Sequence, residues 1–102
     1  MNNGFSVKDL MFSIGDLVSV KSDGFWPYSG MEGRVISVDR LGTPAHDTGN
    51  ETDDIHIDFS SYEYSESQKA AFEQRFNQPF DSIAFDDVIM PPESLKRSLS
   101  NI

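Results

Sequence analysis

The chain has 102 residues, which is enough for one domain with one modest hydrophobic core. Its hydrophobic fraction of 37% and aromatic fraction of 12% are typical of a folded protein, and the absence of cysteine excludes disulfides and thiolate metal sites. The net charge of −9 disfavours binding to nucleic acid or to an anionic membrane surface, because both require clustered Lys and Arg side chains.

The first two predicted strands are short apolar runs at 16–21 and 33–39. The insert between them holds Gly24, Pro27 and Gly30, which are typical of loops. Before the first strand, the spacing of three apolar residues predicts one helical turn, formed by Val7, Leu10 and Met11.

Both faces of the second predicted strand carry apolar residues, as expected in a small barrel whose strands are partly buried on both sides. Strict alternation would divide that strand into two faces, one with Arg34, Ile36 and Val38 and the other with Val35 and Ser37.

These two runs resemble the opening hairpin of SH3-like barrels of the KOW type. The family pattern is a Gly-Asp-hydrophobic strand, here Gly15-Asp16-Leu17, then a loop that ends in glycine, then Gly-x-Val, here Gly33-Arg34-Val35. A fainter similarity, through 15–18 and 24–28, is to the PWWP and Tudor modules. The resemblance covers 14–39 and implies a fold rather than an activity, because modules of many functions share it. A glycine at a strand entry also permits positive φ or close backbone approach.

The second half of the chain predicts two more strands and a helix. A long polar connection, 39–54, precedes a strand in which Ile55, Ile57 and Phe59 alternate with polar residues. We expect a helix over 66–76, and we expect the connection to be mobile and exposed.

The ends of this helix carry recognisable signals. Ser65 and Gln68 form a capping-box pattern at its start, and Pro79 stops it. A fourth strand is predicted within 82–90, and 92–97 is expected to form one helical turn. The tail beyond Ser98 is expected to fray.

Five aromatic residues are the first candidate binding group. Large aromatic rings in a loop can bind a cation or anchor a protein partner. The competing interpretation is that the rings pack against the barrel core. The candidates are Phe25, Trp26, Tyr28, Tyr62 and Tyr64.

The acidic connection supplies the second candidate group. Carboxylates there could steer a basic partner, or hold Ca²⁺ or Mg²⁺, but the spacing does not match an EF-hand. A zinc site at His46 and His56 would need carboxylates as its remaining ligands. A solvated acidic loop is the simplest interpretation, and no metal or other cofactor is expected. The candidate partner-binding acids are Asp47, Glu51, Asp53 and Asp54.

The sequence therefore predicts a mainly β protein, a small SH3-like antiparallel barrel with one inserted helix, formed by a single domain over 1–102. The expected function is a noncatalytic, cytoplasmic module that binds a basic protein. Nothing like a signal peptide or membrane span is present. Two alternatives stay open: an acidic inhibitor that mimics nucleic acid, and KOW-like binding of nucleic acid or ribonucleoprotein. No nucleophile elbow, phosphate loop or facing carboxylate pair predicts an enzyme.

Overall fold

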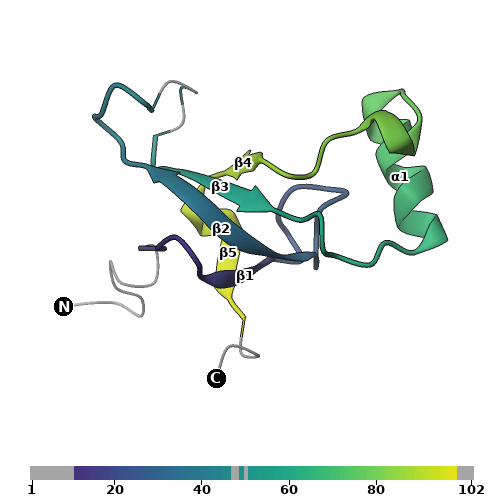
Figure 1. Cartoon of the computed structure of the whole chain (residues 1–102), viewed down its shortest axis with the longest axis horizontal. Coiled ribbons are helices and arrows are strands. Elements are labelled where there is room, and N and C mark those ends of the chain that lie inside the picture. The colour runs from purple at the N-terminus through teal and green to yellow at the C-terminus, as the bar shows by residue number, and fades with distance from the viewer. Residues whose placement is uncertain (1–10, 47–48, 50, 99–102) are drawn as a thin grey trace.

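The computed structural model describes residues 11–46, 49 and 51–98, and within them one five-stranded antiparallel sheet and one α-helix (Figure 1). The strand order across the sheet is β4-β3-β2-β1-β5, so the first four strands form a meander and the last returns to β1. The predicted mainly β architecture is confirmed. The strands are β1 (Leu17–Val20), β2 (Glu32–Asp39), β3 (Asp54–Asp58), β4 (Val88–Met90) and β5 (Leu95–Arg97).

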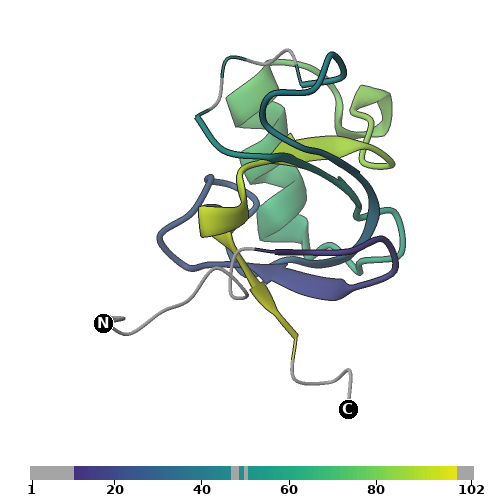
Figure 2. The same ribbon diagram turned by 90° about the vertical axis from the view of Figure 1, so that its left-hand side faces the viewer.

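The sheet curves around its buried face without closing into a hydrogen-bonded barrel (Figure 2). Among the described residues, β4 and β5 are the two edges and do not pair with each other. The connection between them explains this, because Pro91 and Pro92 have no N–H to donate and Pro92 opens a short 3-10 helix, η3 (Pro92–Ser94). The predicted closure of the barrel is therefore not observed.

A β-bulge in β2 changes which of its side chains reach the core. Val35 pairs with Ile57 and Ser37 pairs with His56, so Ile36 is the extra residue on β2. Val38, two positions further along, then packs against the core on the same side as Val35. Strict alternation placed Val38 on the face of Arg34 and Ile36, both of which are exposed, and that grouping is wrong because a bulge shifts the period by one.

The helix α1 (Glu66–Phe76) has the predicted bounds. The Ser65 hydroxyl accepts a hydrogen bond from the Gln68 amide, and the Gln68 side chain accepts one from the Ser65 amide, which completes the capping box. At the other end, Asn77 adopts a left-handed conformation with φ of 56°. The helix lies at the end of the sheet opposite the 39–54 connection and buries Phe72 completely (Figure 1).

The C-terminal part of the chain differs from the sequence prediction. The predicted turn begins correctly as η3, but Leu95 then starts a strand that pairs with β1, and its side chain is buried. Propensity favoured a helix there, and pairing with the exposed edge of β1 overrode it. The fourth strand is shorter than predicted, because β4 covers only Val88–Met90 and 83–87 are irregular. Another 3-10 helix, η2 (Phe80–Ser82), ends where the predicted strand would begin.

At the N-terminal side, Phe12 is fully buried in the core and Met11 is exposed. The helical turn predicted around Val7 and Leu10 lies outside the described residues.

Gly33 is required by close packing of the sheet. A Cβ atom at this position would lie 2.7 Å from side-chain carbons of both Ile57 and Phe59, and 2.8 Å from the Asp58 carbonyl oxygen. Both side chains are fully buried, so neither can move aside easily. Of the two reasons considered for a glycine here, the structure supports close approach.

Replacing Gly33 with Ala should therefore destabilise the protein by about 1–3 kcal/mol, because the added methyl group overpacks the core. Ser37→Ala, at an outward position of the same strand, is the control and should change stability by less than about 0.5 kcal/mol. Urea unfolding measures both values. Equal midpoints for the two variants would contradict the packing role of Gly33.

Candidate functional site

The five candidate aromatic residues separate into two groups. Tyr28, Tyr62 and Tyr64 are partly buried and pack against the hydrophobic core. Phe25 and Trp26 remain exposed, at 46% and 54% of their full accessible surface. The packing interpretation made from the sequence thus applies to the three tyrosines, and Phe25 and Trp26 stay candidates for binding.

The three tyrosines belong to an aromatic cluster between the sheet and α1. The ring of Tyr28 lies 4.9 Å from that of Phe72 in an edge-to-face arrangement, and Tyr64 lies 4.9 Å from Phe85. The Tyr64 hydroxyl donates a hydrogen bond to the Phe59 carbonyl oxygen at 3.1 Å. Burial raises the pKa of both Tyr28 and Tyr64, so these phenols stay neutral and act as packing groups.

Phe25 and Trp26 line a small surface pocket of about 190 Å³ beside the edge strand β4. Its other walls are Tyr28, Arg75 and the three residues of β4. Arg75 is the charged side chain of this lining, and its guanidinium lies 5.1 Å from the centre of the Phe76 ring. Exposed Ile89 extends the same apolar surface along β4.

The loop that carries these two rings is held by backbone hydrogen bonds. The Gly24 amide donates to the Lys21 carbonyl oxygen, the Tyr28 amide to that of Phe25, and the Gly30 amide to that of Val20. The Trp26–Pro27 peptide bond is cis. With Tyr28 anchored in the core, the loop presents Phe25 and Trp26 in a defined position.

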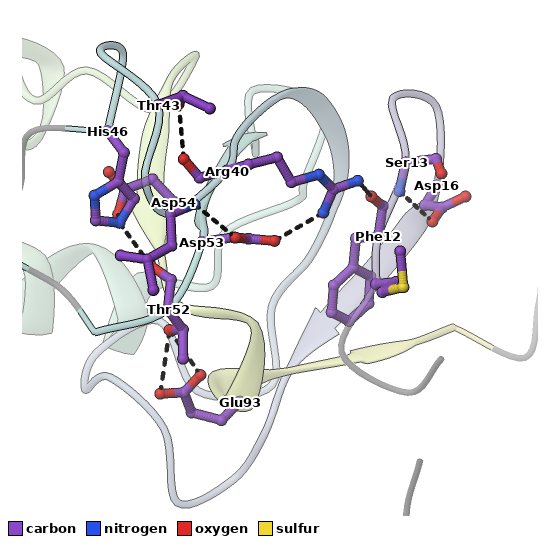
Figure 3. A network of polar contacts seen from close by, with 12 residues as sticks. Phe12, Ser13, Asp16, Arg40, Thr43, His46, Thr52, Asp53, Asp54 and Glu93 are labelled. Carbon is purple, nitrogen blue, oxygen red and sulfur yellow. Dashed lines mark hydrogen bonds and ion pairs between the residues drawn. The ribbon is translucent and has the colours of Figure 1, made fainter. Parts of the chain in front are cut away.

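Asp53, one of the acidic candidates, is used in holding the polar connection (Figure 3). It accepts hydrogen bonds from the Arg40 guanidinium and the Leu41 amide, both at 2.8 Å. Partial burial opposes the charge of Asp53, but these bonds and the Arg40 charge together outweigh it and lower the pKa of the carboxyl group. The same guanidinium also contacts the Phe12 carbonyl oxygen at 3.5 Å.

Asp54 is the first residue of β3 and is almost completely buried. Its carboxylate lies 3.5 Å from His46 Nε2, and this nitrogen is 2.6 Å from the Thr52 carbonyl oxygen. Thr52 in turn donates to the Glu93 carboxylate at 3.1 Å, which joins the connection to η3. Figure 3 shows these contacts beside those of Arg40 and Asp53.

The remaining acidic candidates are placed differently. Glu51 is exposed, and Asp47 lies outside the described residues.

Of the two histidines considered for a zinc site, His46 lies in the buried network and His56 lies on the outer face of the sheet. Within the described ranges, no group of three or more potential ligands has the arrangement that would hold a metal ion. No helix there has the length and apolar character needed to cross a membrane.

No protein-family model matches the chain, and neither the curated proteins nor the solved structures compared with it give a match.

A polar bridge on the outer face of the sheet was not foreseen from the sequence. The two ring nitrogens of His56 on β3 lie 2.7 Å from carboxylate oxygens of Asp39 and Asp87. Asp39 ends β2 and Asp87 directly precedes β4, so one imidazole connects three adjacent strands. Two carboxylate partners require both ring nitrogens to carry protons, which favours the charged imidazolium.

Partial burial opposes that charge, but the hydrogen bonds and negative charges of Asp87 and Asp39 together outweigh it and raise the pKa of His56. A raised pKa in the folded state means that the charged bridge contributes its full stability below the unfolded value of about 6.5 and loses it as pH rises through the higher folded value.

Unfolding free energy should therefore fall as pH rises above about 6.5, and this part of the pH dependence should disappear in His56→Gln. The difference between wild type and variant, measured by urea unfolding from pH 5.5 to 9, isolates the bridge from other titrating groups. A constant difference across that range would contradict the bridging role.

The two aromatic groups should also differ in their effect on stability. Tyr28→Ala removes a ring from the aromatic cluster and should cost about 3 kcal/mol. Trp26→Ala removes a side chain that is more than half exposed and should cost less than about 0.5 kcal/mol. Thermal and urea unfolding measure both. A large loss of unfolding free energy in Trp26→Ala would mean that this ring belongs to the core and not to the surface.

Proposed function

We propose that the protein is a noncatalytic binding module for a basic protein partner. The observation that carries the proposal is the pair of exposed rings, Phe25 and Trp26, held beside the apolar edge strand β4. Tryptophan is enriched among the residues that dominate interface energies, and aromatic residues are enriched in interfaces generally.

The fixed conformation of the 21–31 loop supports this proposal. Its backbone hydrogen bonds and the anchored Tyr28 ring restrict the loop before any partner arrives. A restricted loop loses less conformational entropy on binding, so more of the interaction energy remains as affinity.

The charge of the chain supports a basic partner. With a net charge of −9, the surface should attract a cationic protein over a long range and raise its association rate. The contribution of each acid differs, because Asp53 and Asp54 are engaged in the polar network while Glu51 is exposed. Long-range steering depends on total charge, so it does not require the acids to touch the partner.

The KOW-type SH3-like identity of the 14–39 hairpin remains part of the proposal, and its support is the sequence pattern around Gly15 and Gly33. It adds nothing to the choice of ligand, because the fold hosts many functions. The cytoplasmic location is likewise proposed from composition. Mimicry of nucleic acid and direct nucleic-acid binding are the two competing functions that the following experiment also examines.

The test is capture of partners from a lysate of the source cell by immobilised protein at low salt, with elution by rising salt. Wild type should retain a basic protein that Trp26→Ala retains at least about 30-fold less well, as expected for a residue that contributes about 2 kcal/mol or more. Leu41→Ala is the matched control, because Leu41 is also 54% exposed but lies on the 39–54 connection.

Equal loss of the partner in Trp26→Ala and Leu41→Ala, or no loss in either, would contradict the proposed surface. Capture of a DNA-handling enzyme that is insensitive to Trp26→Ala would favour mimicry instead. Retention of nucleic acid would favour the KOW-like alternative.

A further inference from the structure

A second concave surface lies on the outer face of the sheet, away from the Phe25–Trp26 pocket. It is a groove of about 710 Å³ that crosses β1, β2 and β3 and is bounded by the segment 61–63 after β3. The strand register brings Leu17, Arg34 and Asp58 into one row across these three strands. The groove is thus built on the rigid part of the fold.

Apolar groups form part of its lining. Ile36, the extra residue of the β2 bulge, is 40% exposed, and half-buried Leu17 lines the groove with it. Tyr62 forms a side wall, fixed by an edge-to-face contact with Tyr64 at 5.1 Å and by a hydrogen bond from the Gln68 side chain. This lining can accept an aliphatic stem and the flank of a planar or cationic group.

Three carboxylates and one guanidinium surround the apolar lining, from Glu32, Asp58, Glu63 and Arg34. Hydrogen bonds from the Ser60 hydroxyl and amide both end on Asp58 Oδ1 and lower the pKa of Asp58, so this carboxyl group is ionised at neutral pH. Arg34 directs its guanidinium to the Gly15 carbonyl oxygen at 2.9 Å. The balance of three negative groups against one positive group favours a cation.

We propose that this groove receives a lysine or arginine side chain of the basic protein partner. The aliphatic stem lies on Leu17 and Ile36, and the cationic head lies among the carboxylates beside the Tyr62 ring. The assignment rests on the proposed function, and it names the chemistry by which the module distinguishes a basic partner from other proteins. Long charged side chains bury their stems on apolar surface and keep the charged head at the polar rim, which is the arrangement offered here.

The experiment uses two short probes and the full chain. The blocked peptides acetyl-Gly-Lys-Gly-amide and acetyl-Gly-Arg-Gly-amide are titrated into ¹⁵N-labelled protein at low salt while amide resonances are followed by NMR. Saturable shifts are expected at Gly33, Ile36 and Tyr62. A matched peptide with norleucine in place of lysine keeps the stem without the charge, and it should bind up to about 5-fold more weakly.

Two double variants then distinguish the effect of the charges in the groove from the effect of the net charge of the protein. Asp58→Asn with Glu63→Gln removes two charges from the groove and should weaken the lysine peptide on the order of 5-fold. Glu51→Gln with Glu66→Gln removes two charges elsewhere and should leave the affinity nearly unchanged. Because Asp58 also holds Ser60, the single variant Glu63→Gln, at an exposed position, is measured as well and should weaken binding without affecting folding.

Equal effects of the two double variants, or equal binding of the norleucine peptide, would overturn the groove assignment. Shifts spread over the whole acidic surface would overturn it too. If partner capture depends on Trp26 but is indifferent to both groove variants, the binding module stands and the groove assignment fails.

Discussion

The aromatic cluster between the sheet and α1 is the contact on which the rest of the structure depends. Phe72, the single fully buried residue of the helix, meets Phe85 and Tyr28, each with ring centres 4.9 Å apart. Tyr28 also approaches Phe59 at the end of β3. One ring from the 21–31 loop therefore connects loop, helix and sheet, while Phe25 and Trp26 of the same loop remain exposed.

Hydrogen bonds and ion pairs hold two regions that lie outside the hydrophobic core, the 39–54 connection and the outer face of the sheet. Within the connection 39–54, Arg40 pairs with Asp53 and His46 lies beside Asp54. Arg40 also contacts the Phe12 carbonyl oxygen, and Thr52 donates to Glu93 of η3, so these two contacts join the connection to the rest of the protein. In Figure 3 these contacts lie between Phe12 and Glu93 of η3. On the outer face, His56 holds the short edge strand β4 to its neighbours through Asp87 and Asp39. Four carboxylates of this acidic chain, those of Asp39, Asp53, Asp54 and Asp87, are thus engaged in structural contacts.

The sequence predicted the elements whose signals are local. The helix α1 has the expected bounds because its capping box and the following proline specify both ends within a few residues. The alternation of Ile55 and Ile57 likewise identified β3. The bulge at Ile36 and the strand β5 could not be predicted, because both depend on pairing with strands distant in sequence.

The candidate site shows the same division. Phe25 and Trp26 were identified as candidates from their loop, but only packing against Phe72 distinguishes Tyr28 from them. The His56 bridge joins residues separated by 17 and 31 positions, so no local pattern indicates it. The groove on β1, β2 and β3 depends on strand register, which places Leu17 and Asp58 in the same row. Register is a property of the assembled sheet and was not available from composition or spacing.

The most direct test of the account uses Trp26, the only tryptophan in the chain, as a fluorescent reporter. Its emission should be that of a solvent-exposed indole in the isolated protein and should shift to shorter wavelength when the captured basic protein is added, because binding removes water from the ring. The shift should saturate at the same partner concentration as the binding itself. A partner that binds with no change in Trp26 emission would contradict the claim that this ring is displayed for recognition.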